Sequence, residues 1–458
     1  MELNKTLPTG YFILDIMLGQ NIRDLQGNLK DSQRGFEIRR QYDFAGMQGA
    51  GKTSLISELI SMPIFAGYPC HKVLIIDSDI SYDLHRIKKL TNLPDDVIES
   101  KFEICETKVI EEVVDKLKEL NDEYLAQKYR PVEITNYYTG QKQKMMPYVM
   151  VIVDTVTALV PRINDIDGKE DIYANQIGMT TNRLISNLVN IMPQYCGGNI
   201  CTIWASHLKK NMPQMGQTVA EKQMKSSSAA TKNSVPTRIL QSASAIFEMK
   251  PIDASNLESS THPIAKYELT DMPTKNIYAV ELRSTKSRTG CEGRTKFVMM
   301  YVNGKFDRTL SLLIGAYELG IFKEGPDIYP SGEYEYVFKE GPEYDILKRK
   351  KKRALRLDGY SRPTNIIEAR LLLKYTGDDP ELNKLRAELE LAIYQNIEDK
   401  LDYELEVNNV TQEELASNNR QITNMFKLMA QLRRHATRDP NEVVQVPPKL
   451  EEDDTNAD

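Results

Sequence analysis

A glycine-rich run that ends in lysine and threonine constrains this chain more than any other segment. Residues 46–53 read GMQGAGKT and match the pattern G-x-x-x-x-G-K-[ST] at every fixed position. Glycines let the backbone point its N–H groups at a phosphate chain, the lysine adds a cation, and the threonine hydroxyl can ligate Mg²⁺. The neighbouring residues predict a strand that ends at Ala45 and a helix that opens at Ser54, whose N-terminus would also face an anion.

This run predicts that the chain binds a nucleotide through its phosphates. A glycine turn can match the pattern by accident, but the strand and the helix on either side favour the nucleotide site. The residues expected to contact the cofactor are Gly46, Gly49, Ala50, Gly51, Lys52, Thr53 and Ser54.

An apolar segment further along the chain ends in a carboxylate. Residues 148–154 read YVMVIVD, which has the length and composition of a buried parallel strand. An acid at the carboxyl end of such a strand lies where ligands bind in open α/β sheets. Asp154 is therefore expected to hold Mg²⁺ together with Thr53.

A second apolar segment, residues 71–79, ends in two carboxylates, Asp77 and Asp79. A water that attacks a γ-phosphate needs an acceptor to orient it, and either acid could serve. Both could instead cap the helix that is expected to begin near Tyr82.

These motifs occur with others, and in the same order, in the RecA/Rad51-type recombinases, and the chain resembles the phage UvsX-like members of that family most. The resemblance runs from Leu7 to about Phe322. Segment 8–19 resembles the family's lead-in, 151–161 its strand with the metal-binding acid, and 304–320 its closing strand and helix. It implies an α/β fold with a RecA-like P-loop ATPase core, in which helices flank a mostly parallel sheet, and a largely helical C-terminal region.

The same resemblance assigns roles to residues around the phosphate loop. In the family, the last acid after the second strand activates the attacking water, and Asp79 matches it with a side chain one methylene shorter than glutamate. His207 ends a strand whose final residue senses the γ-phosphate. Asp83 matches an acid near the adenine, while Arg86 replaces the usual aromatic residue and could stack through its guanidinium.

Two basic residues are expected to act across a subunit interface. Lys286 and Arg288 match family positions that reach the ATP of the neighbouring subunit, where they would neutralise developing phosphoryl charge. From composition alone, these two residues would be interpreted as charged side chains of a solvent-exposed turn. By resemblance, catalysis is expected from Asp79, Lys52, His207, Lys286 and Arg288.

Two loops, near residues 161–172 and 208–238, are the expected DNA contacts. The second is long for an irregular stretch within a compact domain, which makes it either functional or a mobile linker. Its lysines can meet phosphates, although it has no aromatic residue for base stacking. The expected DNA-binding residues are Arg162, Lys169, Lys209, Lys210, Lys222, Lys225, Lys232 and Arg238.

The extent of the resemblance sets the expected domain organisation. Residues 1–322 would form the ATPase core, 323–438 a mostly helical region and 439–458 an acidic, disordered tail. Insertions are expected near 21–41 and 131–147, the second as a hairpin. The docking arm with which family members begin would be missing or very short here.

Composition narrows the class of protein further. Of 458 residues, 41% are hydrophobic and 27% charged, which is typical of a globular chain. No apolar run approaches a membrane span and no signal peptide opens the chain, so an intracellular location is expected. Five cysteines without a CxxC spacing argue against zinc and against a disulfide framework. The net charge of −6 does not by itself indicate nucleic acid, because DNA contact depends on local patches.

The combined pattern favours a DNA-dependent ATPase that forms filaments on single-stranded DNA and exchanges strands. The resemblance implies ATP and Mg²⁺ as cofactors, homologous duplex DNA, further copies of the chain, and single-strand-binding and loader proteins as partners, and a phage protein in the cytoplasm of a host cell. Two alternatives stay open. A RecA-fold hexameric helicase shares these motifs, although the segment KSRT at 286–289 speaks against it; a non-filamentous accessory ATPase would agree with the short N-terminus.

Overall fold

A computed structural model describes residues 3–23, 29–91, 93–138, 140–162, 170–210, 231–252, 277–288, 296–302, 304–328, 352–362 and 364–407. By its internal contacts the chain divides into two units, Met1–Leu401 and Asp402–Asp458. The elements below belong to the first unit, except that the last helix extends a few residues into the second. A boundary near residue 322 stays a prediction, and the predicted acidic tail lies outside the described residues.

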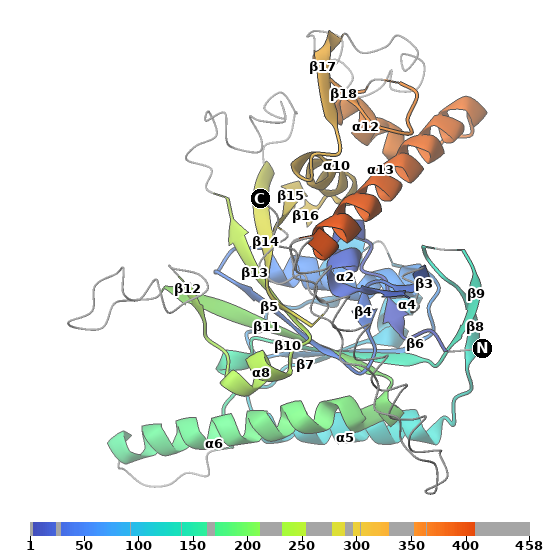
Figure 1. Cartoon of the computed structure of the whole chain (residues 1–458). Coiled ribbons are helices and arrows are strands. Elements are labelled where there is room, and N and C mark those ends of the chain that lie inside the picture. Colours follow the sequence, from blue (N-terminus) through green and yellow to red (C-terminus); the bar gives the residue numbers. More distant parts are fainter. Residues whose placement is uncertain are drawn as a thin grey trace, which may run out of the picture. The chain divides into compact units, whose positions relative to one another are not determined.

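A ten-stranded sheet in the described part of the chain organises the fold (Figure 1). Its order is β16-β15-β14-β13-β5-β11-β10-β6-β7, and β12 pairs with β11. The strands are β5 (Gln41–Gly46), β6 (Cys70–Asp77), β7 (Phe102–Cys105), β10 (Tyr148–Asp154), β11 (Ile200–Lys210), β12 (Thr231–Asn233), β13 (Ala245–Pro251), β14 (Ile277–Ser287), β15 (Lys296–Val302) and β16 (Lys305–Phe306).

The sheet is mixed. The six strands from β7 to β13 run parallel, whereas β12, β14, β15 and β16 pair antiparallel. Helices flank it, so the expected α/β class is confirmed.

Helices and short strand pairs complete the described part. The helices are α1 (Phe12–Leu18), α2 (Lys52–Phe65), α3 (Leu84–Thr91), α4 (Asp95–Lys101), α5 (Ile110–Ala126), η1 (Val156–Ala158), α6 (Glu170–Ile191), η2 (Met192–Gly198), α8 (Thr237–Ser242), α10 (Arg308–Glu318), α12 (Ile366–Leu373) and α13 (Pro380–Val407). The short pairs are β1 (Thr6–Leu7) with β4 (Phe36–Glu37), β2 (Gln20–Arg23) with β3 (Leu29–Gln33), β8 (Val132–Thr135) with β9 (Lys142–Met145), and β17 (Lys323–Ile328) with β18 (Lys352–Arg356). The hairpin expected over 131–147 is therefore present.

Strand β10 shows why the sheet forms as it does. It lies between β11 and β6, and each of its seven residues is buried. A parallel strand that is covered on both faces needs a continuous apolar run without alternation, which residues 148–153 supply. In register, Asp154 lies opposite Asp77 of β6 and Ala205 of β11. The polar ends of these strands thus meet at one edge of the sheet.

One face of the sheet packs on α5 and α6, and α2 lies on the other (Figure 1). Val149, Val151 and Val153 belong to the buried cluster formed with α5 and α6. Trp204 lies in the same cluster, and its indole N–H donates to Gln41 Oε1 at 3.1 Å. A buried indole needs such an acceptor, so this bond fixes β11 against the first residue of β5.

Asp307 joins helix α12 to the core. The aspartate caps α10 by accepting from the Leu310 N–H, and Arg370 and Lys374 donate to its Oδ2 atom, each at 2.6 Å. Burial alone would raise the pKa of Asp307, but these two cations hold it below its usual value. Residues 366–374 therefore pack on the core through a buried ion pair.

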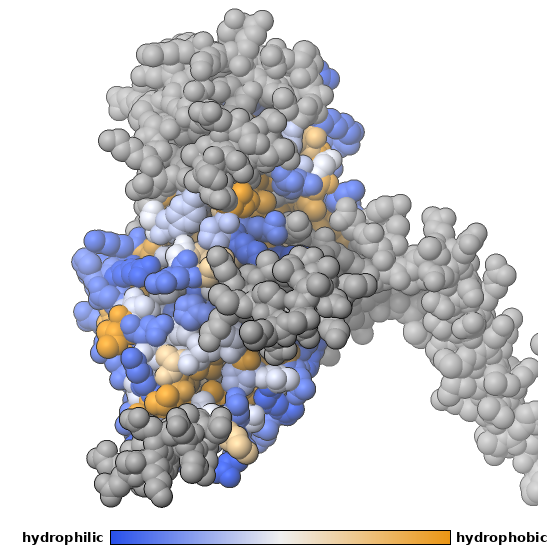
Figure 2. Space-filling view, turned by 90° about the vertical axis from the view of Figure 1, so that its left-hand side faces the viewer, coloured by the Kyte–Doolittle hydropathy of each residue, from blue (hydrophilic) through white to orange (hydrophobic). Residues whose placement is uncertain are grey.

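The face of the molecule in Figure 2 is mostly hydrophilic where residues are described, with scattered hydrophobic patches. Among the described residues, no helix is both long enough and apolar enough to span a membrane.

Candidate active site

The phosphate-loop motif joins the end of β5 to the start of α2. Gly49 has φ 78° and Gly51 has φ 80°, a left-handed conformation that glycine adopts at little cost. A Cβ atom at Gly51 would lie 3.1 Å from the Phe306 ring, and one at Gly46 would lie 3.1 Å from Lys52 Cγ. The backbone conformation therefore favours glycine at positions 49 and 51, and close neighbours leave little room for a side chain at positions 46 and 51.

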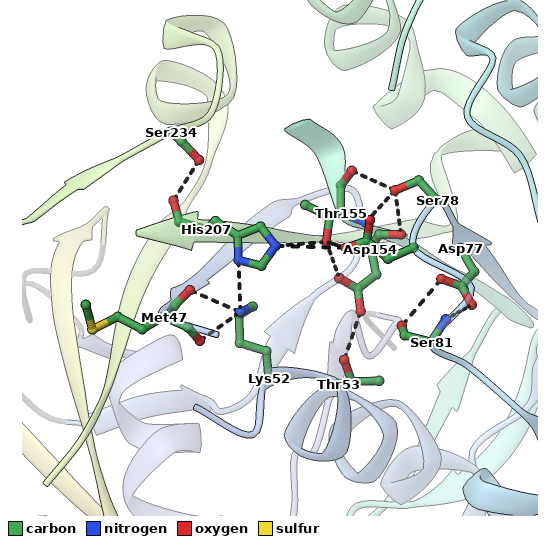
Figure 3. A network of polar contacts seen from close by, with 12 residues as sticks. Met47, Lys52, Thr53, Asp77, Ser78, Ser81, Asp154, Thr155, His207 and Ser234 are labelled. Atoms are coloured by element: carbon green, nitrogen blue, oxygen red, sulfur yellow. Dashed lines mark hydrogen bonds and ion pairs between the residues drawn. The ribbon is translucent and has the colours of Figure 1, made fainter. Parts of the chain in front are cut away.

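Lys52 lies across the loop that it follows. Its side chain is largely buried, and Nζ donates to the carbonyls of Gly46 at 3.0 Å and Met47 at 3.2 Å (Figure 3). His207 Nδ1 is 3.5 Å from the same nitrogen. Burial lowers the pKa of Lys52, while the charges of Asp154 and Asp79 oppose that shift. The loop thus holds a cation where a phosphate chain would bind.

Thr53 and Asp154 form the candidate metal site. The Thr53 hydroxyl donates to Asp154 Oδ2 at 3.1 Å, and Asp154 is 3% exposed. Burial raises the pKa of Asp154, although hydrogen bonds from Thr53 and Thr155 and the charge of Lys52 lower it. A hydroxyl and a carboxylate suit Mg²⁺, a hard cation that takes oxygen ligands.

These two residues fit Mg²⁺ that is bound jointly with a nucleotide. Among the described residues, no group of three His, Cys, Asp or Glu side chains could hold a metal ion. Mg²⁺ in phosphate-transfer sites is held by one or two carboxylates plus substrate phosphates and waters. The pair therefore suits a metal that arrives with phosphate oxygens.

The two acids at the end of β6 and just after it differ in burial and in their hydrogen-bond partners. Asp77 is fully buried, and its Oδ2 accepts from the N–H groups of Ser81 and Tyr82, each at 2.7 Å. Asp79 is 43% exposed, and its Oδ2 accepts from the Thr155 hydroxyl at 2.6 Å. The capping alternative is therefore observed for Asp77, whereas water activation by Asp79 stays a prediction. Asp77 caps the following turn, and Asp79 points into the cluster around Lys52.

His207 connects this cluster to the second predicted DNA loop. It lies opposite Gly46 in the register of β11 and β5, and its Nε2 is 3.4 Å from the Thr155 hydroxyl and 3.9 Å from Asp79 Oδ2. Its main-chain carbonyl accepts from both the N–H and the hydroxyl of Ser234, at 3.1 and 2.7 Å. One residue thus contacts the phosphate-loop lysine and anchors the chain that returns from residues 211–230.

Of the two residues expected near the adenine, Arg86 lies close to the phosphate loop, and Asp83 makes no hydrogen bond to it within the described residues. Arg86 donates to the Ser54 hydroxyl at 3.1 Å and to the Ser81 carbonyl at 3.4 Å, so it contacts the first turn of α2. Asp83 is exposed and accepts from the His85 N–H at 3.0 Å, a contact within its own helix start.

An aromatic cluster beside the loop was not foreseen from the sequence. The rings of Tyr278 and Tyr301 stack at 4.4 Å, and Phe306 meets Tyr301 edge-on at 5.0 Å and packs against Gly51. The three residues come from β14, β15 and β16. Only the pairing of these strands brings the rings together. The order of residues along the sequence therefore gives little indication of the cluster. Such rings can stack on a nucleobase.

Lys286 and Arg288 lie at the other end of the parallel strands. Lys286 pairs with Ile246, which pairs with Asp43 in the first half of β5. Lys286 Nζ donates to the carbonyl of Gln241 at 2.8 Å, and Arg288 donates to the same carbonyl at 3.3 Å. Both cations therefore hold the C-terminal end of α8 and are not brought to the phosphate loop of their own chain.

The predicted DNA-binding residues are described only in part. Arg162 is exposed and pairs with Glu112 at 3.5 Å, and Arg238 donates to the Asn190 side chain at 3.0 Å. Lys209 and Lys232 are register partners in the β11–β12 hairpin, which also contains Lys210. The remaining three, Lys169, Lys222 and Lys225, lie outside the described residues.

Asp43 carries a prediction about stability. It is fully buried on β5, where Asn233 donates to its carboxylate, and burial raises its pKa from 3.8 to about 7, with nearby Glu248 adding to the rise. The protonated form is favoured in the folded state, so the stabilisation is complete below pH 3.8 and is lost as pH rises through about 7. The difference between these two pKa values corresponds to roughly 4 kcal/mol of the free energy of unfolding.

The variant Asp43→Asn keeps the acceptor for Asn233 but cannot ionise. Its free energy of unfolding, measured in urea between pH 5 and 8, should fall by less than that of the wild type, with the gap widest at pH 8. Asp15, whose pKa burial also raises to about 7, is unchanged in both proteins. The exposed Asp115→Asn variant is the control, and parallel curves for Asp43→Asn and wild type would contradict the prediction.

Comparisons with known proteins add no family to this description. No protein-family model matches the chain, and no curated protein matches it significantly.

Proposed function

We propose that this chain is a RecA-type, ATP-dependent recombinase that assembles on single-stranded DNA and exchanges strands. The observation that carries the proposal is the meeting of Lys52, the Thr53–Asp154 pair, Asp79 and His207 at one edge of the parallel sheet. Nucleotides bind at the carboxyl ends of parallel strands in such folds. The resemblance in sequence then selects the recombinases among the proteins that share this chemistry.

In the proposed reaction, backbone N–H groups of the loop and the Lys52 ammonium hold the phosphates of ATP. Thr53 and Asp154 would hold Mg²⁺, which offsets negative charge on the phosphates. Asp79 would accept a hydrogen bond from the attacking water and take up its proton. Its half-exposed carboxylate is steadied by Thr155 at 2.6 Å, which leaves the second oxygen to face a water.

His207 supports coupling between ATP and DNA in this proposal. Its ring lies within 3.5 Å of Lys52 Nζ, and its carbonyl holds Ser234 at the end of the second predicted DNA loop. A γ-phosphate that contacts the ring would therefore also bias the position of that loop. Two sites coupled through one shared residue must influence each other reciprocally.

The placement of Lys286 and Arg288 supports assembly through unlike surfaces. They lie at the amino end of the parallel strands, whereas the phosphate loop lies at the carboxyl end. If they complete a neighbour's ATP site, the two ends must meet head to tail. Such heterologous contacts generate either open helical filaments or closed rings. A ring would indicate the helicase alternative.

The second DNA loop gives a direct test of DNA binding. Removing its lysines should flatten the dependence of log affinity on log salt by about 0.7 for each lost phosphate contact with a single strand. The fivefold alanine variant replaces Lys209, Lys210, Lys222, Lys225 and Lys232. Its affinity for an oligothymidylate would be measured by fluorescence anisotropy at several salt concentrations.

A matched control removes five lysines that lie elsewhere on the described surface: Lys88, Lys89, Lys118, Lys142 and Lys384. It has the same net charge as the loop variant and should keep the wild-type slope. If the loop variant also keeps that slope, residues 208–238 act only as a linker.

A further inference from the structure

A cavity of about 750 Å³ lies at the amino end of the parallel strands. Gln41, which begins β5, Asn199, which precedes β11, and Ser244, which precedes β13, all line it. Gln41 and Gly46 are the two ends of β5, and a strand rises about 3.3 Å per residue, so the cavity and the phosphate loop lie about 17 Å apart along the sheet. Phosphate groups held by the loop therefore lie outside this cavity in the same chain.

The described lining of this cavity is strongly basic. Five cations line it: Lys5, Arg39, Arg40, Arg238 and Arg288. The one carboxylate in the lining, Glu37, already accepts from Arg40 at 3.0 Å. The cavity therefore carries an excess of positive charge.

Neutral oxygens hold two of the arginines in place. Arg238 donates to the Asn190 side-chain oxygen, and Arg288 donates to the carbonyls of Gln241 and Ser242 at 3.3 Å. Amide oxygens orient a guanidinium without cancelling its charge. Within the described residues, both arginines are thus held by neutral oxygens and keep their charge for an anion.

Arg39 is fixed through its backbone. It has φ 72°, and its N–H donates to the Ile200 carbonyl at 2.6 Å. Its side chain runs beside Gly198, where a Cβ atom would lie 3.5 Å from Arg39 Cδ. A residue other than glycine, asparagine or aspartate seldom adopts a left-handed conformation, so this placement of an arginine is unusual.

We propose that this cavity is a second oxyanion site, which binds phosphate groups presented from outside the chain. Guanidinium groups present a planar fork of donors that matches phosphate oxygens. The volume lies in the range of sites for small molecules and cofactors. The assignment rests on the cavity itself; only the choice between two phosphate sources rests on the proposed function.

The first source is a nucleotide bound to the phosphate loop of a second copy, because Arg288 lies at the end of the strands that a head-to-tail neighbour would meet. The second source is a nucleic-acid backbone. Arg238 also lines an adjoining cavity of about 640 Å³, with Val160 and Ser234 in its wall. Val160 precedes the first predicted DNA loop and Ser234 lies within the second, so a strand held there could extend past Arg238.

The test uses inorganic tripolyphosphate without Mg²⁺ as the probe, in a Lys52→Ala background that weakens the phosphate loop. Calorimetry on this variant should find one saturable site. Adding Arg39→Gln, Arg238→Gln and Arg288→Gln should weaken binding by roughly tenfold or more, because charge-assisted hydrogen bonds are lost. A control with Lys118→Gln, Lys142→Gln and Lys384→Gln removes equal charge from exposed positions and should not.

Arg39→Gln alone guards against misfolding of the triple variant. Within the described residues the Arg39 side chain makes no hydrogen bond or ion pair, and this variant should still weaken binding severalfold. No saturable binding in the Lys52→Ala protein, or equal weakening in the control, overturns the site. If the wild-type protein does not hydrolyse ATP, that result counts against the proposed function. It leaves the binding of tripolyphosphate in the cavity as evidence for the oxyanion site.

Two further experiments identify the source of the phosphate that binds in the cavity, and a positive result in either supports the oxyanion site. If the phosphate belongs to nucleic acid, tripolyphosphate should displace a labelled oligothymidylate from the Lys52→Ala protein but not from the same protein with the three arginine changes. If it belongs to a neighbour's nucleotide, mixing the triple arginine variant with Lys52→Ala should restore hydrolysis that neither supplies alone. Failure of both experiments would overturn a role for the cavity in either complex.

Discussion

Lys52→Ala is expected to abolish ATP hydrolysis and to weaken nucleotide binding severely. The lysine ammonium is held over the phosphate loop by two carbonyl oxygens, at 3.0 and 3.2 Å, and is largely shielded from water. A charge in such a preorganised and poorly hydrated position stabilises developing phosphoryl charge far better than it would in water. Removing a single such donor costs about 10² to 10³ in rate in well-studied sites, and the loss of binding adds to this.

Phosphate release, followed with a coupled assay at saturating ATP and Mg²⁺, measures the first effect, and binding of a fluorescent ATP analogue measures the second. Lys118→Ala, which removes an exposed lysine on α5, is the control and should behave as wild type. The thermal unfolding midpoint shows whether the Lys52 variant remains folded. Turnover like that of the wild type in a folded Lys52→Ala protein would refute the nucleotide site.

Asp79→Asn is expected to keep ATP binding and to slow hydrolysis by about 10² to 10⁴, the usual contribution of a positioned general base. The amide can still accept from the Thr155 hydroxyl, so the geometry is preserved, but it is a poor base. Asp77→Asn should affect folding more than chemistry, because Asp77 is buried and accepts two backbone N–H bonds. Single-turnover rates with bound ATP separate the chemical step from binding.

The comparison of these two acids decides between them. An unchanged rate in Asp79→Asn together with an inactive, folded Asp77→Asn would show that Asp77, and not Asp79, activates the water. Asp79→Glu adds one methylene to the side chain. If the shorter aspartate limits reach toward the attacking water, this variant should hydrolyse ATP faster than the wild type.

Part of the site could be predicted from the sequence because it follows from local pattern and from a rule of sheet geometry. Residues 46–53 fix a loop by themselves, and apolar runs that end in Asp154 and Asp79 place acids at the carboxyl ends of strands. When such strands are parallel and adjacent, their ends meet. The contact between Thr53 and Asp154, 101 residues apart, is the consequence.

The different surroundings of Asp77 and Asp79 could not be predicted from residue types. It depends on how the chain turns after β6, where Ile80 has φ 54° and the backbone N–H groups of residues 81 and 82 fold back onto Asp77. Such a turn depends on the contacts around it. The alternation of side chains between the two faces of a strand does not predict it. The resemblance in sequence had to supply the choice of Asp79.

Features that depend on strand pairing were out of reach of the sequence. The rings of Tyr278, Tyr301 and Phe306 meet because β14, β15 and β16 are antiparallel. Their register places Tyr301 opposite both Tyr278 and Phe306. The basic cavity depends likewise on the sheet order. Arg39 precedes β5 and Arg288 follows β14, and they come together because β13 pairs with both strands. Patterns along the chain do not encode these distances.

Electron microscopy of the negatively stained protein, with long single-stranded DNA and a slowly hydrolysed ATP analogue, tests the recombinase proposal most directly. The proposal predicts helical filaments along the DNA that require both the nucleotide and Lys52. Closed rings would point to a helicase, and separate particles to an accessory ATPase. Either outcome, with a folded protein that binds the analogue, would contradict the proposed function.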